Sequence, residues 1–421
     1  MTTPSQWIPD FETASRLGSE YGTPVFIYDG PTIEAQAKKA LAFPNAYGLT
    51  VRYAMKAAPN RFLLRQMNRW GLHFDASSGW EIERLLAAGI EAKHISLSTQ
   101  ELPLEFAHWL EQGVTVNACS LDQLERIGRA VPGTTIGIRI NPGLGSGGTN
   151  RTNVGGIASS FGIWHEYIPR ILEIAERHKL TIFRVHTHIG SGSDPAVWQR
   201  VARMSLETVA RFPDVRVLNL GGGYKVARIP SEKSTDLQEI GTSVKSLFED
   251  FAEQYSRELK LEIEPGTFLV ANGGSLLSRI QDTVDTGADG YRFLKLDTGM
   301  TEILRPSLYG AQHPLHIIQE QPAAAERDYI VVGHCCESGD ILTPAPGDPE
   351  GLQPRRLPEA SIGDYCWIGG AGAYCSAMAS GNYNSFPLVA ELWHEGGGRF
   401  RLIRRRQTLE QILQNEASLE A

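Results

Sequence analysis

The stretch VRYAMKAAPN, residues 51–60, begins as an apolar segment typical of a buried strand and breaks at Ala58-Pro59-Asn60. Similar short apolar or β-branched segments recur along the chain, separated by helical patterns. The eight segments are TVRYAMK (50–56), LHFDASS (72–78), HISLST (94–99), VTVNACS (114–120), IGIRIN (136–141), IFRVHTHIG (182–190), VRVLNLGGG (215–223) and LEIEPG (261–266). Buried strands that alternate with helices predict a parallel sheet, either doubly wound or closed into a (β/α)8 barrel.

The helical patterns between these strands have ordinary start and stop signals. GWEIERLLAAG (79–89) carries apolar residues on one face and ends on Gly89, and SLDQLERIGRA (120–130) begins with a serine N-cap. Strand and helix therefore alternate regularly in the first two thirds of the chain.

The residues at the strand ends favour the barrel over the open sheet. Nearly every segment finishes in polar or glycine residues that could take part in catalysis or ligand binding: Lys56, Asp75, Ser98, Asn117, Asn141, His188, Gly221 to Gly223 and Glu264. In a barrel all eight carboxyl ends meet at one mouth, where active sites lie, whereas an open sheet spreads them along an edge. We therefore expect an α/β protein with a (β/α)8 TIM-type barrel.

The pattern changes after about residue 280. Helical spacing gives way to short alternating segments such as YRFLKLDTG, DYIVVGHCCES and DYCWIGGAGAYC, with glycine and proline between them. Residues 281–421 are therefore expected to form a mainly antiparallel β domain, a barrel or sandwich, after a barrel of residues 30–280.

Composition excludes several classes of protein. The chain has 421 residues, a formal net charge of −8 and no basic footprint for nucleic acid, and we read Arg404-Arg405-Arg406 as a solvated strand end. No secretion signal or membrane-length apolar stretch is visible, so we expect a cytoplasmic protein without membrane contact. Five irregularly spaced cysteines, with no CxxC pair or HExxH, argue against a disulfide framework and a metal site.

Lys56 has two interpretations. It could be a snorkelling or ion-paired side chain, or a partly desolvated amine that forms a Schiff base with the aldehyde of pyridoxal phosphate. That cofactor needs a phosphate cradle, a residue against its ring and a carboxylate at its pyridine nitrogen. Gly221 to Gly223, His188 and Glu264 offer these three, and Ser191 could donate to the phosphate.

Together these motifs resemble the fold-type III pyridoxal-phosphate decarboxylases, the group of ornithine and diaminopimelate decarboxylases, and most closely the latter. The resemblance runs from about residue 20 to 390, through YAMKAAPN, FDASSGWEI, IRINPG, HTHIGSGSD, NLGGGYKV, EPG, DTGMTEILRPSLYGA, VVGHCCESGDIL and GAGAYCSAMASGNYN. It implies that residues 1–29 join 281–421 in the β domain.

The resemblance also implies a role for each matching residue. Lys56 would bind the cofactor covalently, His188 would stack on its ring and Glu264 would meet its nitrogen. The other expected cofactor contacts are Asp75, Ser191, Gly221, Gly222, Gly223, Gly266 and Tyr374. Cys336 would be the catalytic acid, and the expected substrate contacts are Glu337, Arg305, Tyr309 and Thr267. Because Cys336 and Glu337 reach the site from the partner subunit in this family, the resemblance implies a homodimer with shared active sites.

Two departures from the family pattern affect the substrate. The family usually has an arginine after EPG that binds a substrate carboxylate, and this chain has Thr267. In the loop of residues 143–163, Ser160 replaces a family lysine, and Arg151 could supply a positive charge or be a solvated loop residue. The expected substrate is meso-diaminopimelate, decarboxylated to L-lysine. The alternatives are D- or L-lysine, D- or L-ornithine, or a carboxylated siderophore or antibiotic intermediate; a racemase or a cofactor-free regulator is less favoured.

Overall fold

The computed structural model describes residues 7–145, 155–188 and 190–417, which form two compact units. The barrel unit comprises Ala35–Val226 and Lys233–Leu269. The β unit comprises the chain up to Glu34, the short segment Ala227–Glu232 and the chain from Val270 onward. The expected domain boundaries at residues 30 and 280 stay a prediction, because compactness alone does not define a functional domain.

Eight parallel strands among the described residues close into the predicted barrel. They are β2 (Leu49–Ala54), β3 (His73–Ala76), β4 (Ile95–Ser98), β5 (Thr115–Ala118), β6 (Thr135–Asn141), β8 (Thr181–Thr187), β9 (Val217–Asn219) and β10 (Lys260–Ile263). Strand β10 pairs with β2 on one side and β9 on the other, and β5 pairs with β6, so the ring has no free edge. The short β7 (Ile163–Trp164) is added beside β6. All eight predicted strands are present, although several end before the predicted residue, and the doubly wound alternative is wrong.

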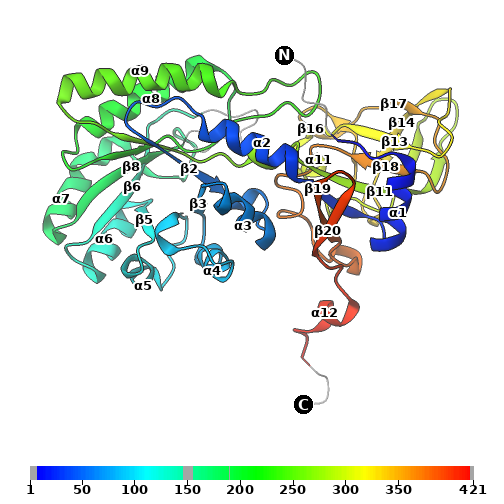
Figure 1. Cartoon of the computed structure of the whole chain (residues 1–421), viewed down its shortest axis with the longest axis horizontal. Coiled ribbons are helices and arrows are strands. Elements are labelled where there is room, and N and C mark those ends of the chain that lie inside the picture. The colour runs from blue at the N-terminus through cyan, green and yellow to red at the C-terminus, as the bar shows by residue number, and fades with distance from the viewer. Residues whose placement is uncertain (1–6, 146–154, 189, 418–421) are drawn as a thin grey trace. The chain divides into compact units, whose positions relative to one another are not determined.

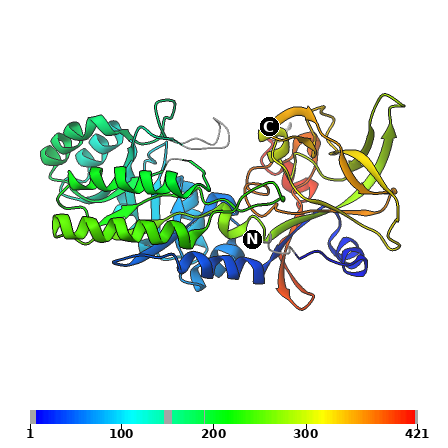
Figure 2. The ribbon, with the colours of Figure 1, turned by 90° about the horizontal axis from the view of Figure 1, so that it is seen from above.

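Helices surround the barrel strands, as Figures 1 and 2 show for α7, α8 and α9. Their bounds are α3 (Arg61–Arg69), α4 (Gly79–Ala87), α5 (Phe106–Glu111), α6 (Leu121–Ala130), α7 (Ile168–His178), α8 (Pro195–Ala210) and α9 (Leu237–Tyr255). Ser120 caps α6 as predicted, because its side chain accepts a hydrogen bond from the backbone N–H of Gln123 at 3.0 Å. Helices α2 (Gly30–Leu41) and α10 (Thr267–Val270) each include a boundary between the units.

The β unit contains a larger sheet in the order β17-β14-β12-β11-β1-β19-β20, with β18 and β13 branching from β11. The strands are β1 (Val25–Asp29), β11 (Gly274–Asp285), β12 (Arg292–Leu296), β13 (Leu315–Ile318), β14 (Glu326–Val332), β17 (Arg355–Pro358), β18 (Tyr365–Ile368), β19 (Ala390–Gly396) and β20 (Arg399–Arg404). A small hairpin, β15 (Pro344–Ala345) with β16 (Asp348–Leu352), and the helices α1 (Phe11–Tyr21), α11 (Arg305–Tyr309) and α12 (Leu409–Leu413) complete the unit. The pairing is mainly antiparallel, and the pairs β1–β19 and β12–β14 are parallel.

The core of the β unit joins segments from both ends of the chain. Strand β1 lies between β11 and β19, and Leu17, Ile27, Leu277, Trp367 and Leu392 pack in one buried cluster. The expectation of a solvated strand end at residues 404–406 is wrong for two of the three residues. Arg404 forms an ion pair at 3.0 Å with the buried Glu391, and Arg406 donates to the carbonyl of Pro24 at 2.6 Å.

Candidate active site

Lys56 lies at the carboxyl end of the barrel, two residues beyond the end of strand β2. Strand β2 ends at Ala54, and Lys56 is in a single 3-10 turn, Met55–Ala57, so the prediction that the strand continues to Lys56 is wrong. The turn exposes the side chain, whose Nζ donates to the hydroxyl of Ser77 at 3.4 Å. Strand pairing sets Ala54 beside Asp75, and the Ala54 N–H donates to the carbonyl of Pro265 at 3.2 Å. The turn that carries the lysine is therefore fixed next to the ends of β3 and β10.

Glu264 follows β10 and is buried among polar partners in the barrel unit. Its carboxylate accepts a hydrogen bond from Nδ2 of Asn219 at 2.6 Å, and it lies 3.2 Å from Nε2 of His186 and 3.6 Å from a guanidinium nitrogen of Arg184. Burial opposes ionisation, but His186 and Arg184 outweigh it and hold the pKa of Glu264 well below its usual range. The carboxylate is therefore ionised at neutral pH.

A buried charge network supports Glu264 from inside the barrel. Glu262 binds Arg52 at 3.0 and 2.8 Å and Arg184 at 2.5 Å. Register explains the arrangement, because His186 on β8 and Glu262 on β10 both pair with Asn219 on β9. None of these supporting residues was predicted from the sequence. The signal was present as polar side chains inside apolar strands, but only the register shows which of them meet Glu264.

Asp75 and His188 each contribute a buried polar atom that has no hydrogen-bond partner in the described part of the chain. These atoms are Oδ1 of Asp75 and Nδ1 of His188. Burial, followed by repulsion from Glu264, raises the pKa of Asp75 well above its usual value. Burial, followed by Arg139 and Lys56, lowers the pKa of His188 well below its usual value, which leaves a neutral imidazole.

The glycine loop after β9 packs too closely for any side chain. Gly221 has φ 72°, and a β-carbon there would lie 2.7 Å from Cβ of His188. A β-carbon on Gly222 would collide with the carbonyl oxygen of Glu264, and one on Gly223 with that of Gly190. The backbone of the glycine loop therefore packs directly against two segments: the residues that follow β10, and the loop that carries His188 and Ser191.

These residues fit pyridoxal phosphate. The barrel mouth offers an accessible amine, an ionised carboxylate, a neutral imidazole and a glycine loop whose backbone can approach a phosphate. The unpartnered Oδ1 of Asp75 and Nδ1 of His188 are the atoms that a bound polar group would satisfy. Gly266 is buried and directly follows Glu264 and Pro265 in the segment after β10.

The structure places Cys336 and Glu337 in the β unit, on the loop after β14. Both are exposed. The N–H of Cys336 donates to Oδ1 of Asn384 at 2.8 Å, and the hydroxyl of Tyr383 donates to Glu337 at 3.5 Å. The neighbouring Cys335 differs, because burial, with a contribution from Asp340, raises the pKa of its thiol to about 12.

Arg305, Tyr309 and Tyr374 also belong to the β unit. Arg305 and Tyr309 begin and end helix α11, with the guanidinium carbon 5.9 Å from the centre of the tyrosine ring. Tyr374 is half-buried and has φ 57°, a conformation that side chains rarely adopt outside functional or strained sites.

The departures from the family pattern fall in the barrel unit. Thr267 is half-buried at the start of α10. Ser160 accepts a hydrogen bond from Gln100 at 2.9 Å. Arg151 lies outside the described residues.

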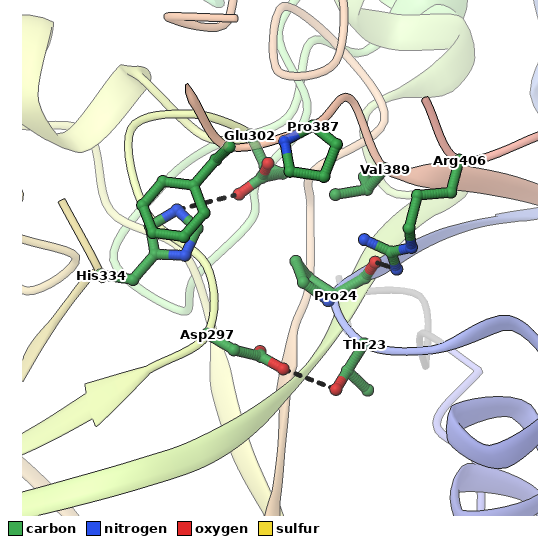
Figure 3. A pocket seen from close by; sticks show the side chains of 9 residues that line it. Thr23, Pro24, Asp297, Glu302, His334, Pro387, Val389 and Arg406 are labelled. Atoms are coloured by element: carbon green, nitrogen blue, oxygen red, sulfur yellow. Dashed lines mark hydrogen bonds and ion pairs between the residues drawn. The ribbon is translucent and has the colours of Figure 1, made fainter. Parts of the chain in front are cut away.

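A separate pocket of about 190 Å³ lies in the β unit and contains none of the expected site residues. Figure 3 shows Glu302 facing His334 in it, and Oε2 of Glu302 lies 3.9 Å from Nε2 of His334. Burial raises the pKa of Glu302 to about 7, although hydrogen bonds from Thr301 and Thr298 oppose the shift. Burial lowers the pKa of His334 to about 4, so the pair is not a permanent ion pair.

In residues 7–145, 155–188 and 190–417, no group of three or more His, Cys, Asp or Glu side chains is arranged to hold a metal ion. Of the helices in the same ranges, none combines the length and the apolarity needed to cross a lipid bilayer.

Comparison with known proteins gives consistent results. A family described as "Pyridoxal-dependent decarboxylase, pyridoxal binding domain" matches residues 32–271. The diaminopimelate decarboxylase of Streptomyces coelicolor is 35% identical over 94% of this chain and 90% of its own, and that of Escherichia coli K12 is 35% identical over 96% of both. A crystal structure of diaminopimelate decarboxylase superposes with a TM-score of 0.87 at 34% identity, over 95% of this chain and 94% of the other. That of the Helicobacter pylori enzyme complexed with L-lysine gives 0.82 at 28% identity, over 95% and 98%.

Proposed function

The chain belongs to the pyridoxal-dependent decarboxylases, and from this premise we propose that it decarboxylates meso-diaminopimelate to L-lysine with pyridoxal phosphate. The observation that carries the proposal is the buried, ionised Glu264 beside the glycine loop, in the same barrel mouth as Lys56. The relatives named diaminopimelate decarboxylase support the choice of substrate.

The cofactor would be held by residues of the barrel unit. Lys56 would bind it covalently, the glycine loop with Ser191 and Gly266 would surround the phosphate, and His188 would cover one face of the ring. Glu264 would accept a hydrogen bond from the ring nitrogen and, because its pKa is lowered, keep the proton on that nitrogen. When bound, pyridoxal phosphate supplies an electron sink for the pair that remains when the bond from Cα to the carboxylate breaks.

The remaining chemistry belongs to the β unit. Cys336 would donate a proton to Cα after CO2 leaves, and Glu337 would bind the distal ammonium of the substrate. Arg305 and Tyr309 would bind the distal carboxylate, and Tyr374 would help to hold the phosphate. We also propose that the two compact units are the functional domains, and that Cys336 and Glu337 act in the site of the partner subunit of a homodimer.

The direct test is an assay for CO2 release from a panel of amino acids. We expect release from meso-diaminopimelate, and much less from D-lysine, L-lysine, D-ornithine and L-ornithine. Lys56→Ala should lose both the release and the visible absorbance of bound cofactor, whereas Lys93→Ala, at an exposed ion pair with Glu91, should keep both. A wild-type protein that binds the cofactor but releases CO2 from none of these compounds would refute the proposal.

A further inference from the structure

Arg228 is a buried cation fixed in place by its own segment of the β unit. The segment Ala227–Glu232 returns to this unit between two stretches of the barrel unit, and Arg228 is only 8% exposed. Asn272 donates to the carbonyl of Ala227 at 2.9 Å, and the N–H of Arg228 donates to Glu232 at 2.8 Å. These contacts set the backbone so that the side chain points inward.

The Arg228 side chain extends along a glycine that makes room for it. Its Nε donates to the carbonyl of Gly370 at 3.0 Å. Gly370 has φ 64°, and a β-carbon there would lie 2.9 Å from Cδ of Arg228. The carbonyl oxygen of the preceding residue, Gly369, lies 2.9 Å from Nδ1 of His313. Arg228 and His313 therefore lie side by side on this turn.

This cluster contains two guanidinium groups, and the carboxylate of Glu232 accepts from the backbone N–H of Arg228 and not from its side chain. Arg228 and Arg305 take part in no ion pair with a carboxylate among the described residues, and three of the cluster's nitrogen atoms have no hydrogen-bond partner there: Nη2 of Arg228, Nε of Arg305 and Nε2 of His313. Burial, followed by repulsion from Arg305, lowers the pKa of Arg228 to about 10, although the negative charge of Glu232 opposes the shift. An unpaired buried guanidinium is costly to maintain, and guanidinium groups bind oxyanions through parallel hydrogen bonds.

We propose that Arg228, together with Arg305, binds the second carboxylate of the substrate and so selects for substrates that carry one. This inference rests on the proposed function and adds a specificity-determining residue to it. The chemistry required is that of an oxyanion, so the phosphate of the cofactor is the competing ligand. Arg228 would add a guanidinium for the substrate carboxylate in a chain that has Thr267 where the family usually has an arginine.

The test compares two ligands that differ by one carboxylate. L-Lysine, the expected product, keeps the carboxylate that the arginines would bind, and cadaverine is the same diamine without it. Calorimetry on the cofactor-loaded enzyme gives both affinities without turnover. In Arg228→Met we expect L-lysine to bind at least about tenfold more weakly, with the affinity for cadaverine and the cofactor content unchanged. The KM for meso-diaminopimelate should rise by a similar factor.

Two further variants make the result specific. Arg228→Gln keeps a donor for the Gly370 carbonyl but has no charge, so it should show the same loss while preserving the fold. Arg355→Met removes another partly buried arginine of the β unit, one whose Nε also has no partner and whose pKa is lowered by burial alone, and it should change neither affinity.

Each other outcome overturns the inference. Loss of cofactor from Arg228→Gln would show that the Arg228 guanidinium binds the phosphate of the cofactor and not the substrate carboxylate. Equal weakening of L-lysine and cadaverine would show a purely structural role, and unchanged affinities would show no role in binding. Failure of the proposed function itself is distinguishable, because the wild-type enzyme would then release no CO2 from meso-diaminopimelate.

Discussion

Asn219 donates a hydrogen bond to the carboxylate of Glu264 at 2.6 Å, and its own Oδ1 accepts one from the N–H of Gly221 at 2.7 Å. One amide side chain at the end of β9 therefore holds both the expected ring-nitrogen partner and the start of the glycine loop. Asn219 is fully buried, so water cannot replace either bond.

Asn219→Asp is expected to weaken cofactor binding. The substitution preserves shape but replaces a donor to Glu264 with a second negative charge, which raises the pKa of Glu264. We expect the dissociation constant for pyridoxal phosphate, measured by absorbance titration, to rise about tenfold or more. Asn45→Asp, in the turn before the amino end of β2 and therefore away from the carboxyl ends of the strands, is the matched control. Unchanged cofactor affinity in Asn219→Asp would remove this residue from the site.

Cys336→Ala is expected to retain the cofactor and lose turnover. Loss of a general acid costs about 10²–10⁴-fold in rate, while the barrel residues that would hold the cofactor stay intact. Cys335→Ala should keep most activity, because the raised pKa of the Cys335 thiol makes it a poor source of protons. Steady-state kcat with cofactor absorbance measures both effects, and equal kcat for Cys336→Ala and wild type would contradict the assigned role.

Mixing two inactive variants tests whether active sites are shared between subunits. In the proposed dimer each active site takes Lys56 from one subunit and Cys336 from the other. A heterodimer of Lys56→Ala and Cys336→Ala would therefore contain one site that lacks both residues and one intact site. Random reassembly makes half of the dimers mixed, and we therefore expect recovery to about a quarter of wild-type activity. If each chain builds its own site, mixing would restore nothing.

Glu302→Gln is expected to change how stability depends on pH. The folded-state pKa of Glu302 is raised from 4.5 to about 7, so its contribution to stability is present below pH 4.5 and is lost as the pH rises through 7. Glutamine keeps the acceptor for Thr298 and Thr301 without the buried charge. The variant should gain up to roughly 3 kcal/mol over wild type at pH 8 and less than about 1 kcal/mol at pH 5.

Urea unfolding at the two pH values measures this gain. Glu320→Gln, at an exposed position of the same unit, should show no such difference. A gain for Glu302→Gln that is the same at pH 5 and pH 8 would show that the charge of Glu302 is not responsible.

The sequence by itself determined the eight strands, the order of strands and helices, and the chemistry at the strand ends. These features are local: apolar runs, glycines and polar breaks are readable wherever they occur, and a closed parallel barrel then brings the strand ends to one mouth. Lys56, His188, Glu264 and the glycine loop could be named for this reason, although the 3-10 turn at Lys56 was missed because one turn of backbone has no distinct sequence signal.

Only the tertiary structure decided which polar residues face one another and what burial does to their charge. Strand register sets His186, Asn219 and Glu262 in one row, and register depends on pairing across the whole barrel. Arg228 reaches the Gly369-Gly370 turn beside His313 because a short segment returns to the β unit from within the barrel sequence, a contact that no local pattern encodes. The pKa shifts of Glu264, Asp75 and Arg228 follow from desolvation and neighbouring charges, which exist only once the chain is folded.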